Sequence, residues 1–146
     1  MTRIVVGLDG SSGSRAALTW ALEHAATSGA DLVAVMAYDS GVAWIDVGSE
    51  YQEPMMKEAR RQAERRLREV LAESVPADCD VRVDAVVVVG PAADVLVETA
   101  ADADLLVVGS RGRGGFAGLL LGSVSQRCVE RAPCPVVVVP SREAGR

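Results

Sequence analysis

A glycine-rich stretch near the C-terminus contains the residue types that hold a phosphate group. Five glycines fall in residues 109–118, and a sixth is Gly122. An apolar run at residues 104–108 precedes them, and residues 123–131 have the pattern of a helix. Glycines let the backbone approach an anion closely, while the free N–H groups and the dipole of a helix N-terminus supply positive charge. The order of strand, glycine loop and helix therefore predicts a phosphate-binding site.

A second turn that could contribute to a site follows the first apolar run, residues 4–8. It reads Asp9-Gly10-Ser11-Ser12-Gly13 and leads into an expected helix. In open α/β sheets, ligands bind beyond the carboxyl ends of the strands, where the strand order reverses. If the first and fourth strands are neighbours, the two loops face each other across one crevice. Asp9 would then meet a ribose hydroxyl or a metal ion, and Ser123 and Ser125 would add hydroxyl donors for phosphate.

Other nucleotide-binding signatures do not match. No G-x-x-x-x-G-K-[ST] pattern is present, which excludes a P-loop NTPase. Neither glycine turn completes G-x-G-x-x-G, which disfavours a dinucleotide-binding fold. The second loop has no lysine, and its cations are Arg111 and Arg113. Each arginine is expected either to reach phosphate or to be solvated.

The elements that would position these loops alternate between strand and helix. Apolar runs predict five strands, at residues 4–8, 31–38, 81–89, 104–108 and 136–139. Helical spacing predicts four helices, at residues 14–27, 54–73, 92–103 and 123–131. This alternation predicts a parallel sheet with helices on both faces, in a single domain over residues 1–146. The continuous apolar end of the third strand indicates burial on both of its faces.

Two segments carry open interpretations. Residues 39–53 show no periodicity, and we expect either a lid or a plain mobile insertion there. The helix at residues 54–73 carries many arginines, but glutamates alternate with them. Together with a net charge of −5 and a pI of about 4.9, this favours a solvated helix face over a nucleic-acid surface.

The composition indicates where in the cell the protein is expected and whether its cysteines are expected to be reduced. No apolar run reaches the roughly 18–20 residues that a membrane helix needs, and no signal-peptide pattern opens the chain. We therefore expect a cytoplasmic protein without a membrane partner. Cys79, Cys128 and Cys134 form no C-x-x-C motif and are expected to be reduced thiols, with a Cys128–Cys134 redox pair as the alternative.

The glycine spacing is specific enough to indicate a family. Gly109-x2-Gly112-x9-Gly122-Ser123 resembles the ATP-binding signature of the universal stress protein family. Residues 4–9, 108–112 and 132–139 resemble the same family, and the similarity spans roughly residues 2–140. The resemblance implies a Rossmann-like sheet of five parallel strands in the order 3-2-1-4-5, similar to adenine nucleotide alpha hydrolases, and a cytoplasmic homodimer.

The resemblance also implies a ligand and its contacts. ATP would bind with its adenine against a main-chain group near Met36 and with Asp9 contacting the nucleotide. The phosphates, sometimes with Mg²⁺, would rest on the glycine loop and the helix start, which comprise Gly109, Arg111, Gly112, Gly122, Ser123, Val124 and Ser125. The dimer would pair the last strands through Val136, Val137, Val138 and Val139. Pairing would remove an exposed apolar edge, which the C-terminal tail would otherwise have to cover.

Binding is better supported than catalysis. Phosphoryl transfer needs a positioned base or water, a metal site and stabilisation of charge in the transition state. Asp9 is the carboxylate that the sequence places in the crevice, and His24 falls within the first helix, where a surface or packing role is expected. The sequence thus favours an ATP-binding regulatory protein of the stress response and predicts no catalytic residue.

Two alternatives stay open. The first is a slow ATPase or nucleotide-dependent transferase, because residues 9–14 distantly resemble the pyrophosphatase loop of adenylating synthetases. The second is an interaction module that binds another adenine nucleotide or none.

Overall fold

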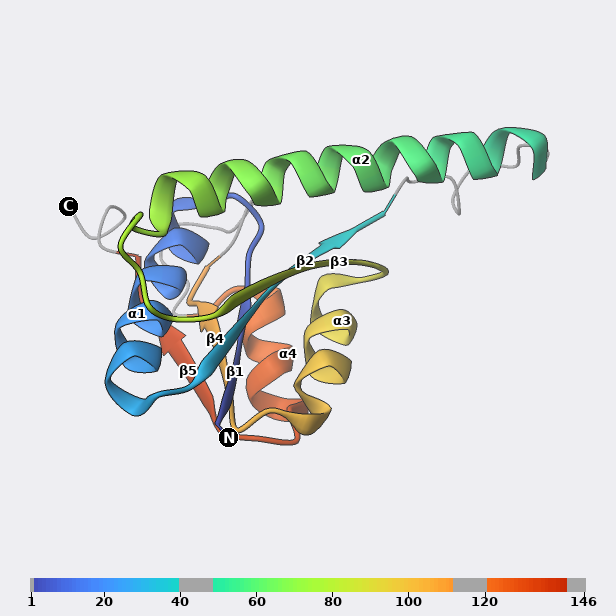
Figure 1. Cartoon of the computed structure of the whole chain (residues 1–146). Helices are drawn as coiled ribbons and strands as arrows, with labels where there is room; N and C mark the ends of the chain where they lie inside the picture. The colour runs from blue at the N-terminus through green and yellow to red at the C-terminus, as the bar shows by residue number, and fades with distance from the viewer. Residues whose placement is uncertain (1, 40–48, 112–120, 142–146) are drawn as a thin grey trace.

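The computed structural model describes residues 2–39, 49–111 and 121–141. Five parallel strands form one sheet in the order β3-β2-β1-β4-β5 (Figure 1). The strands are β1 (Arg3–Gly7), β2 (Asp31–Tyr38), β3 (Val83–Val89), β4 (Leu105–Gly109) and β5 (Val136–Val139). The expected parallel sheet and its order are confirmed.

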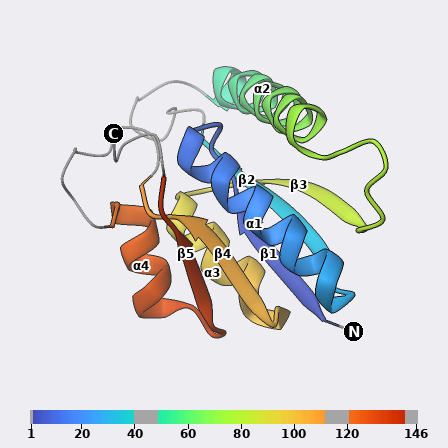
Figure 2. The same cartoon turned by 90° about the vertical axis from the view of Figure 1, so that its left-hand side faces the viewer.

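Helices cover both faces of the sheet. The helices α1 (Ser12–Ser28) and α2 (Ser49–Ser74) lie on one face, and α3 (Ala92–Thr99) and α4 (Ser123–Arg131) lie on the other (Figure 2). The expected third helix changes to a 3-10 turn, η2 (Ala100–Asp102), before β4 begins. The chain thus forms three layers, with the sheet in the middle.

The core is aliphatic and divides between the two sides of the sheet. Alternate residues of a strand point to opposite faces. Ile4 and Val6 of β1 accordingly pack toward α1 and α2, whereas Val5 packs toward α3 and α4. All three side chains are fully buried. The central strand β1 is therefore packed from both sides, and the loop at its carboxyl end starts from a well-packed position.

The expectation that β3 is buried on both faces is wrong. Val86 and Val89 are 38% and 50% exposed. The reason is topological, because β3 lies at the edge of the sheet. The helix α2 covers one face of β3, but α3 packs mainly against β2 and β1 on the other side.

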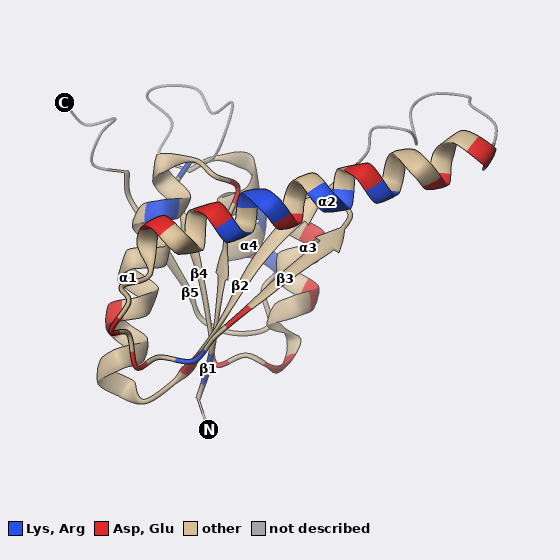
Figure 3. Ribbon diagram, turned by 45° about the horizontal axis from the view of Figure 1, so that its top comes forward, with Lys and Arg blue, Asp and Glu red and all other residues tan. Residues whose placement is uncertain are grey.

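The helix α2 begins earlier than the sequence predicts. Residues 49–53 are helical and Pro54 lies inside the helix, so the expectation of an irregular segment up to residue 53 is wrong. Residues 40–48, the rest of the predicted lid or insertion, lie outside the described residues. Basic and acidic residues are interspersed along α2 (Figure 3), and Arg60 pairs with Glu64 at 3.4 Å. This pattern agrees with the predicted solvated face.

Two further expectations can be compared with the fold. His24 lies on the exposed side of α1, where its ring stacks on Trp20 with the centroids 5.0 Å apart, as a packing role requires. Among the helices that the structure describes, none is both long and apolar enough to cross a membrane.

Candidate functional site

The carboxyl ends of β1 and β4 lie side by side at the point where the strand order reverses. The two strands pair directly, with Val6 of β1 opposite Val107 of β4. The chain leaves β1 toward α1 on one face of the sheet and leaves β4 toward α4 on the other face. The two candidate loops therefore start at the same place, as expected for a ligand site in this class of sheet.

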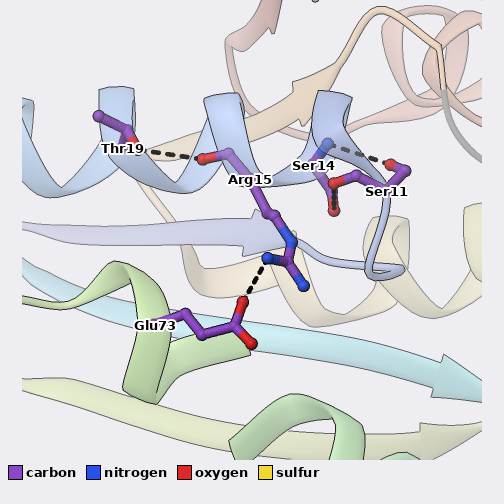
Figure 4. A network of polar contacts seen from close by, with 5 residues as sticks. All are labelled: Ser11, Ser14, Arg15, Thr19 and Glu73. Carbon is purple, nitrogen blue, oxygen red and sulfur yellow. Dashed lines mark hydrogen bonds and ion pairs between the residues drawn. The ribbon is translucent and has the colours of Figure 1, made fainter. Parts of the chain in front are cut away.

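The turn after β1 is held by its own side chains. Asp9 Oδ1 accepts hydrogen bonds from the Ser11 N–H, at 2.9 Å, and from the Ser11 hydroxyl. Ser11 in turn caps α1 by accepting from the Ser14 N–H at 3.2 Å (Figure 4). Gly10 has a φ of +84°, which glycine adopts without strain. The carboxylate that the sequence assigned to the nucleotide is thus fixed before any ligand binds.

An ion pair ties the start of α1 to the end of α2. The Arg15 guanidinium lies against Glu73 of α2, and the Arg15 carbonyl accepts from the Thr19 hydroxyl (Figure 4). Both charged side chains are about half exposed, so water weakens their attraction. The pair orients α2 beside the β1 turn but contributes little to stability.

The two loops touch through a pair of glycines. A Cβ atom placed on Gly109 would lie 2.7 Å from the carbonyl carbon and oxygen of Gly13, closer than real Cβ atoms come. A Cβ on Gly13 would likewise overlap the carbonyl oxygen of Arg111. Because these contacts are to backbone, no side chain can move aside. Glycine at both positions is what lets the first turn of α1 lie directly against the loop after β4.

A buried hydroxyl joins the loop after β4 to the start of α4. Ser125 is 2% exposed, and its hydroxyl lies 2.8 Å from the Ser110 carbonyl and 3.1 Å from the Gly122 carbonyl. The Gly122 N–H donates to the same Ser110 carbonyl. Since a hydroxyl has one hydrogen to donate, Ser125 in this arrangement positions Ser110 and Gly122. The phosphate contact predicted for Ser125 stays a prediction.

The N-terminus of α4 differs from that of α1. Ser11 caps α1 with its side chain, whereas the N-cap residue of α4 is Gly122, which has no side chain to form such a bond. The first N–H groups of a helix have no partner within the helix. Ser123 is exposed and Val124 half-buried at this end. The predicted phosphate donors are thus placed at a helix end that no described side chain caps.

Two further predicted site residues lie at or beyond the end of the described part of the loop after β4. Arg111 is half-buried at the end of the described part of the loop, and its carbonyl oxygen faces Gly13. Gly112, which belongs to the predicted signature, lies outside the described residues.

The register at the end of β2 changes which residue faces the crevice. The Val35 carbonyl accepts from the Leu8 N–H, so the backbone groups of Val35 point toward β1. The Tyr38 carbonyl accepts from the Gly90 N–H, on the opposite side. Because these directions alternate along a strand, Met36 directs its main-chain groups toward β3, and Ala37 directs its own toward the β1 side. Ala37 lies beyond the last β1 pairing, which ends at Val35.

The sequence reasoning missed several residues of the site. Gly13 was part of the recognised turn, but its contact with Gly109 depends on how α1 crosses the sheet. Ser110 and Ala37 carried no signal of their own. Arg66 of α2, whose Cδ would lie 3.3 Å from a Cβ on Gly10, was grouped with the solvated arginines. No pattern in a single sequence brings α2 against this turn.

Two of the three cysteines, Cys128 and Cys134, have raised thiol pKa values. All three are free. Burial raises the pKa of the Cys128 thiol to about 11, and burial together with the charge of Asp104 raises the pKa of Cys134. Thiols with raised pKa values are poor nucleophiles at neutral pH. Within the described residues, no cluster of three His, Cys, Asp or Glu side chains could hold a metal ion.

Comparison with known proteins identifies the family. Residues 1–140 match the model of the universal stress protein family. A universal stress protein of Mycolicibacterium smegmatis is 41% identical over 140 residues, and one of Thermus aquaticus is 36% identical over 138 residues. These alignments cover 95% and 93% of the chain, but 46% and 96% of the respective relatives. The chain thus spans about half the length of the mycobacterial relatives that it matches.

A solved structure agrees in both fold and sequence. A universal stress protein crystallised in complex with cAMP is 33% identical and superposes with a TM-score of 0.72. The match covers 96% of this chain and 97% of that one. The family model, the relatives and the strand order agree, and the chain belongs to the universal stress protein family.

Proposed function

We propose that this chain is an ATP-binding regulatory protein of the stress response, which acts in the cytoplasm and changes its partners with its nucleotide state. The observation that carries the proposal is the N-terminus of α4, where the N-cap residue is Gly122 and no described side chain caps the helix. A helix end of this kind offers N–H donors and the positive end of the helix dipole to an anion. Family membership supports a nucleotide as that anion, because the related structure with 33% identity holds cAMP.

The phosphates would lie on the backbone of this loop. Gly109 and Gly122 present no side chain, and the amides of Ser123 and Val124 would donate to phosphate oxygens. Arg111 and Gly112 would complete the cradle from the loop side. Mg²⁺, where it accompanies ATP, would be held mainly by the phosphates. Ser125 would act indirectly, by fixing the Ser110 carbonyl against Gly122.

The base and ribose would lie toward β2. The main-chain groups of Ala37 face the side where β1 has ended, so we assign the adenine contact to Ala37 in place of its neighbour Met36. Asp9 lies between this position and the phosphate loop. Its Oδ1 already accepts from Ser11, which leaves further carboxylate lone pairs to accept from a ribose hydroxyl.

A second candidate is a receptor for a different adenine nucleotide. The cAMP complex of the relative favours it, because cAMP has a single phosphate and a far smaller negative charge than ATP. The same crevice would hold the base and ribose, and fewer amides at α4 would be used. The two candidates differ in which nucleotide binds most tightly.

Titration of the purified chain with ATP, ADP, AMP and cAMP tests both candidates. We expect ATP to bind most tightly, and Gly122→Val to weaken ATP binding at least tenfold, because the added side chain stands where phosphate would approach. Gly29→Ala, at the far end of α1, is the matched control. Tightest binding of cAMP would favour the second candidate. Absence of any nucleotide binding would refute the site.

Turnover is measured in the same samples. We expect bound ATP to persist over hours, because the described part of the crevice holds no cluster of acidic or histidine side chains that could bind a catalytic metal. Steady release of ADP or AMP would instead assign the chain to the slow ATPases or transferases.

We also propose that two copies pair through β5. The strand lies at an edge of the sheet, and its residues Val136, Val137, Val138 and Val139 are all half-buried. Pairing would satisfy the free edge and cover these side chains. Light scattering should show a dimer for the natural chain and a monomer for Val138→Pro, since proline removes a backbone donor. A dimer that survives this substitution would place the interface elsewhere.

A further inference from the structure

Arg66 of α2 lies against the turn that follows β1. Its Cδ and Cγ would be 3.3 and 3.8 Å from a Cβ on Gly10. The aliphatic stem of the arginine therefore passes directly over Gly10. The turn leaves room for this approach because Gly10 carries no side chain.

The position of Arg66 on α2 explains this direction. The buried stripe of the helix contains Ala63, Leu67 and Val70, which pack in the same cluster as Leu8 and Met36. Residues 63, 66, 67 and 70 share one side of a helix, because residues three and four apart are neighbours. Arg66 is thus at the border of the buried stripe, on the side that faces the end of β1.

Two arginines around α2 have ion-pair partners. Arg60 pairs with Glu64, and Arg15 of α1 pairs with Glu73. Among the residues that the structure describes, Arg66 has no ion pair, and the same is true of Arg61, Arg65 and Arg68. Arg66 is set apart by its stem, which lies close to Gly10. Because the guanidinium is bonded to Cδ, it lies near the turn after β1.

The neighbouring groups indicate which part of a ligand it would meet. Ala37 of β2 and the Asp9–Gly10 turn border the space beyond the end of β1, where the base and ribose are assigned above. The helix α2 packs on β2 and β3, and it reaches this space from the face of the sheet that α1 and α2 cover. The start of α4, which would hold the phosphates, lies on the other face. Arg66 thus lies at the end of the crevice to which the base is assigned.

We propose that Arg66 forms the α2 wall of the base pocket, with its planar guanidinium stacked on the adenine ring. The inference rests on the proposed nucleotide site and adds a residue outside its glycine signature. A guanidinium stacks well on aromatic rings through its flat, delocalised charge, whereas an ammonium group lacks the flat face. Removing the guanidinium should lower the affinity for every ligand that carries the base, by about threefold to tenfold.

The test compares Arg66→Met with Arg65→Met. Methionine keeps the length of the stem over Gly10 but has neither charge nor a planar group. Arg65 is an equally exposed arginine one residue away, directed to a different side of the helix. Calorimetric titrations use adenosine, ATP and inorganic tripolyphosphate as ligands. Thermal unfolding confirms that both variants fold like the natural chain.

We expect Arg66→Met to lose affinity for adenosine and for ATP by the same factor. Its affinity for tripolyphosphate should not change. Arg65→Met should bind all three ligands as the natural chain does. Arg66→Lys should recover only part of the loss. Unchanged adenosine binding in Arg66→Met overturns the inference while the nucleotide site stands. An equal loss for tripolyphosphate also overturns it, because it indicates a general charge effect. Failure of the natural chain to bind ATP or adenosine refutes the nucleotide site, and the inference with it.

Discussion

Gly109→Ala probes the contact between the two loops. The added Cβ would lie 2.7 Å from the carbonyl carbon and oxygen of Gly13 and 3.2 Å from the Ser14 nitrogen. These atoms belong to the first turn of α1, which packs on β4, so they cannot rotate away. The substitution therefore has to separate α1 from the loop after β4. The backbone of Gly109 is not in the left-handed region, so the effect comes from overlap alone.

The size of the effect follows from the geometry. Overpacking a tightly fitted site costs about 1–3 kcal/mol, and contact with backbone favours the upper half of that range. We expect the free energy of unfolding to fall by about 2 kcal/mol, which lowers the Tm of a chain of this length by about 6–8 °C. ATP affinity should fall as well, because the loop that would carry the phosphates moves.

Two glycine substitutions serve as controls for the assay, which combines urea unfolding with ATP titration. Gly29 has a φ of +74° with no atom near its Cβ position, so Gly29→Ala should lose about 1 kcal/mol through backbone strain and keep its ATP affinity. At Gly7 the Cβ would meet the tip of the Leu96 side chain, which can shift. Gly7→Ala should therefore destabilise the chain less than Gly109→Ala.

A Gly109→Ala variant whose unfolding free energy stays within about 0.5 kcal/mol of the natural chain would contradict the expected overlap with Gly13. Ordinary surface substitutions change the free energy by this much. Equal effects of Gly109→Ala and Gly29→Ala on ATP binding would contradict this expectation as well.

Three further predictions concern stability. Ser125→Ala should lower the free energy of unfolding by about 1 kcal/mol, measured in urea, because it removes the buried donor to Ser110. Stability should fall between pH 9 and 11, since the folded state keeps the Cys128 proton after the unfolded thiol has lost it; a Cys128→Ala variant should show a shallower slope in pH-dependent unfolding. Glu73→Gln should change the Tm by less than about 3 °C, because the Arg15–Glu73 pair is half exposed.

Much of this fold is encoded in local patterns. The strands at Ile4–Val6 and Leu106–Val108 are short β-branched and leucine runs, and the glycine turns after them mark where each strand ends. The sequence predicts that these turns bind a ligand, because their glycine and serine residues are of the types that bind phosphate. The helix α1 also ends at a local signal, because Gly29 follows it and adopts a left-handed φ of +74°.

The remaining features depend on contacts between distant segments. An apolar run such as Val86–Val89 reads the same in a central strand and an edge strand, and only the sheet order reveals the exposure of β3. The proposal of Ala37 in place of Met36 as the adenine contact rests on the register of β2 against β1, where a shift of one residue reverses the direction of every backbone group. The contact of Arg66 with Gly10 depends on the path of α2 across the sheet.

The most direct measurement of the central claim identifies the nucleotide that the protein carries. The purified chain is denatured, and the released small molecules are separated and identified by mass spectrometry. We expect an adenine nucleotide, ATP above all, at up to one per chain, and its absence from a Gly122→Val sample prepared in the same way. Release of no nucleotide from the natural chain, together with no binding of added ATP, would contradict the central claim.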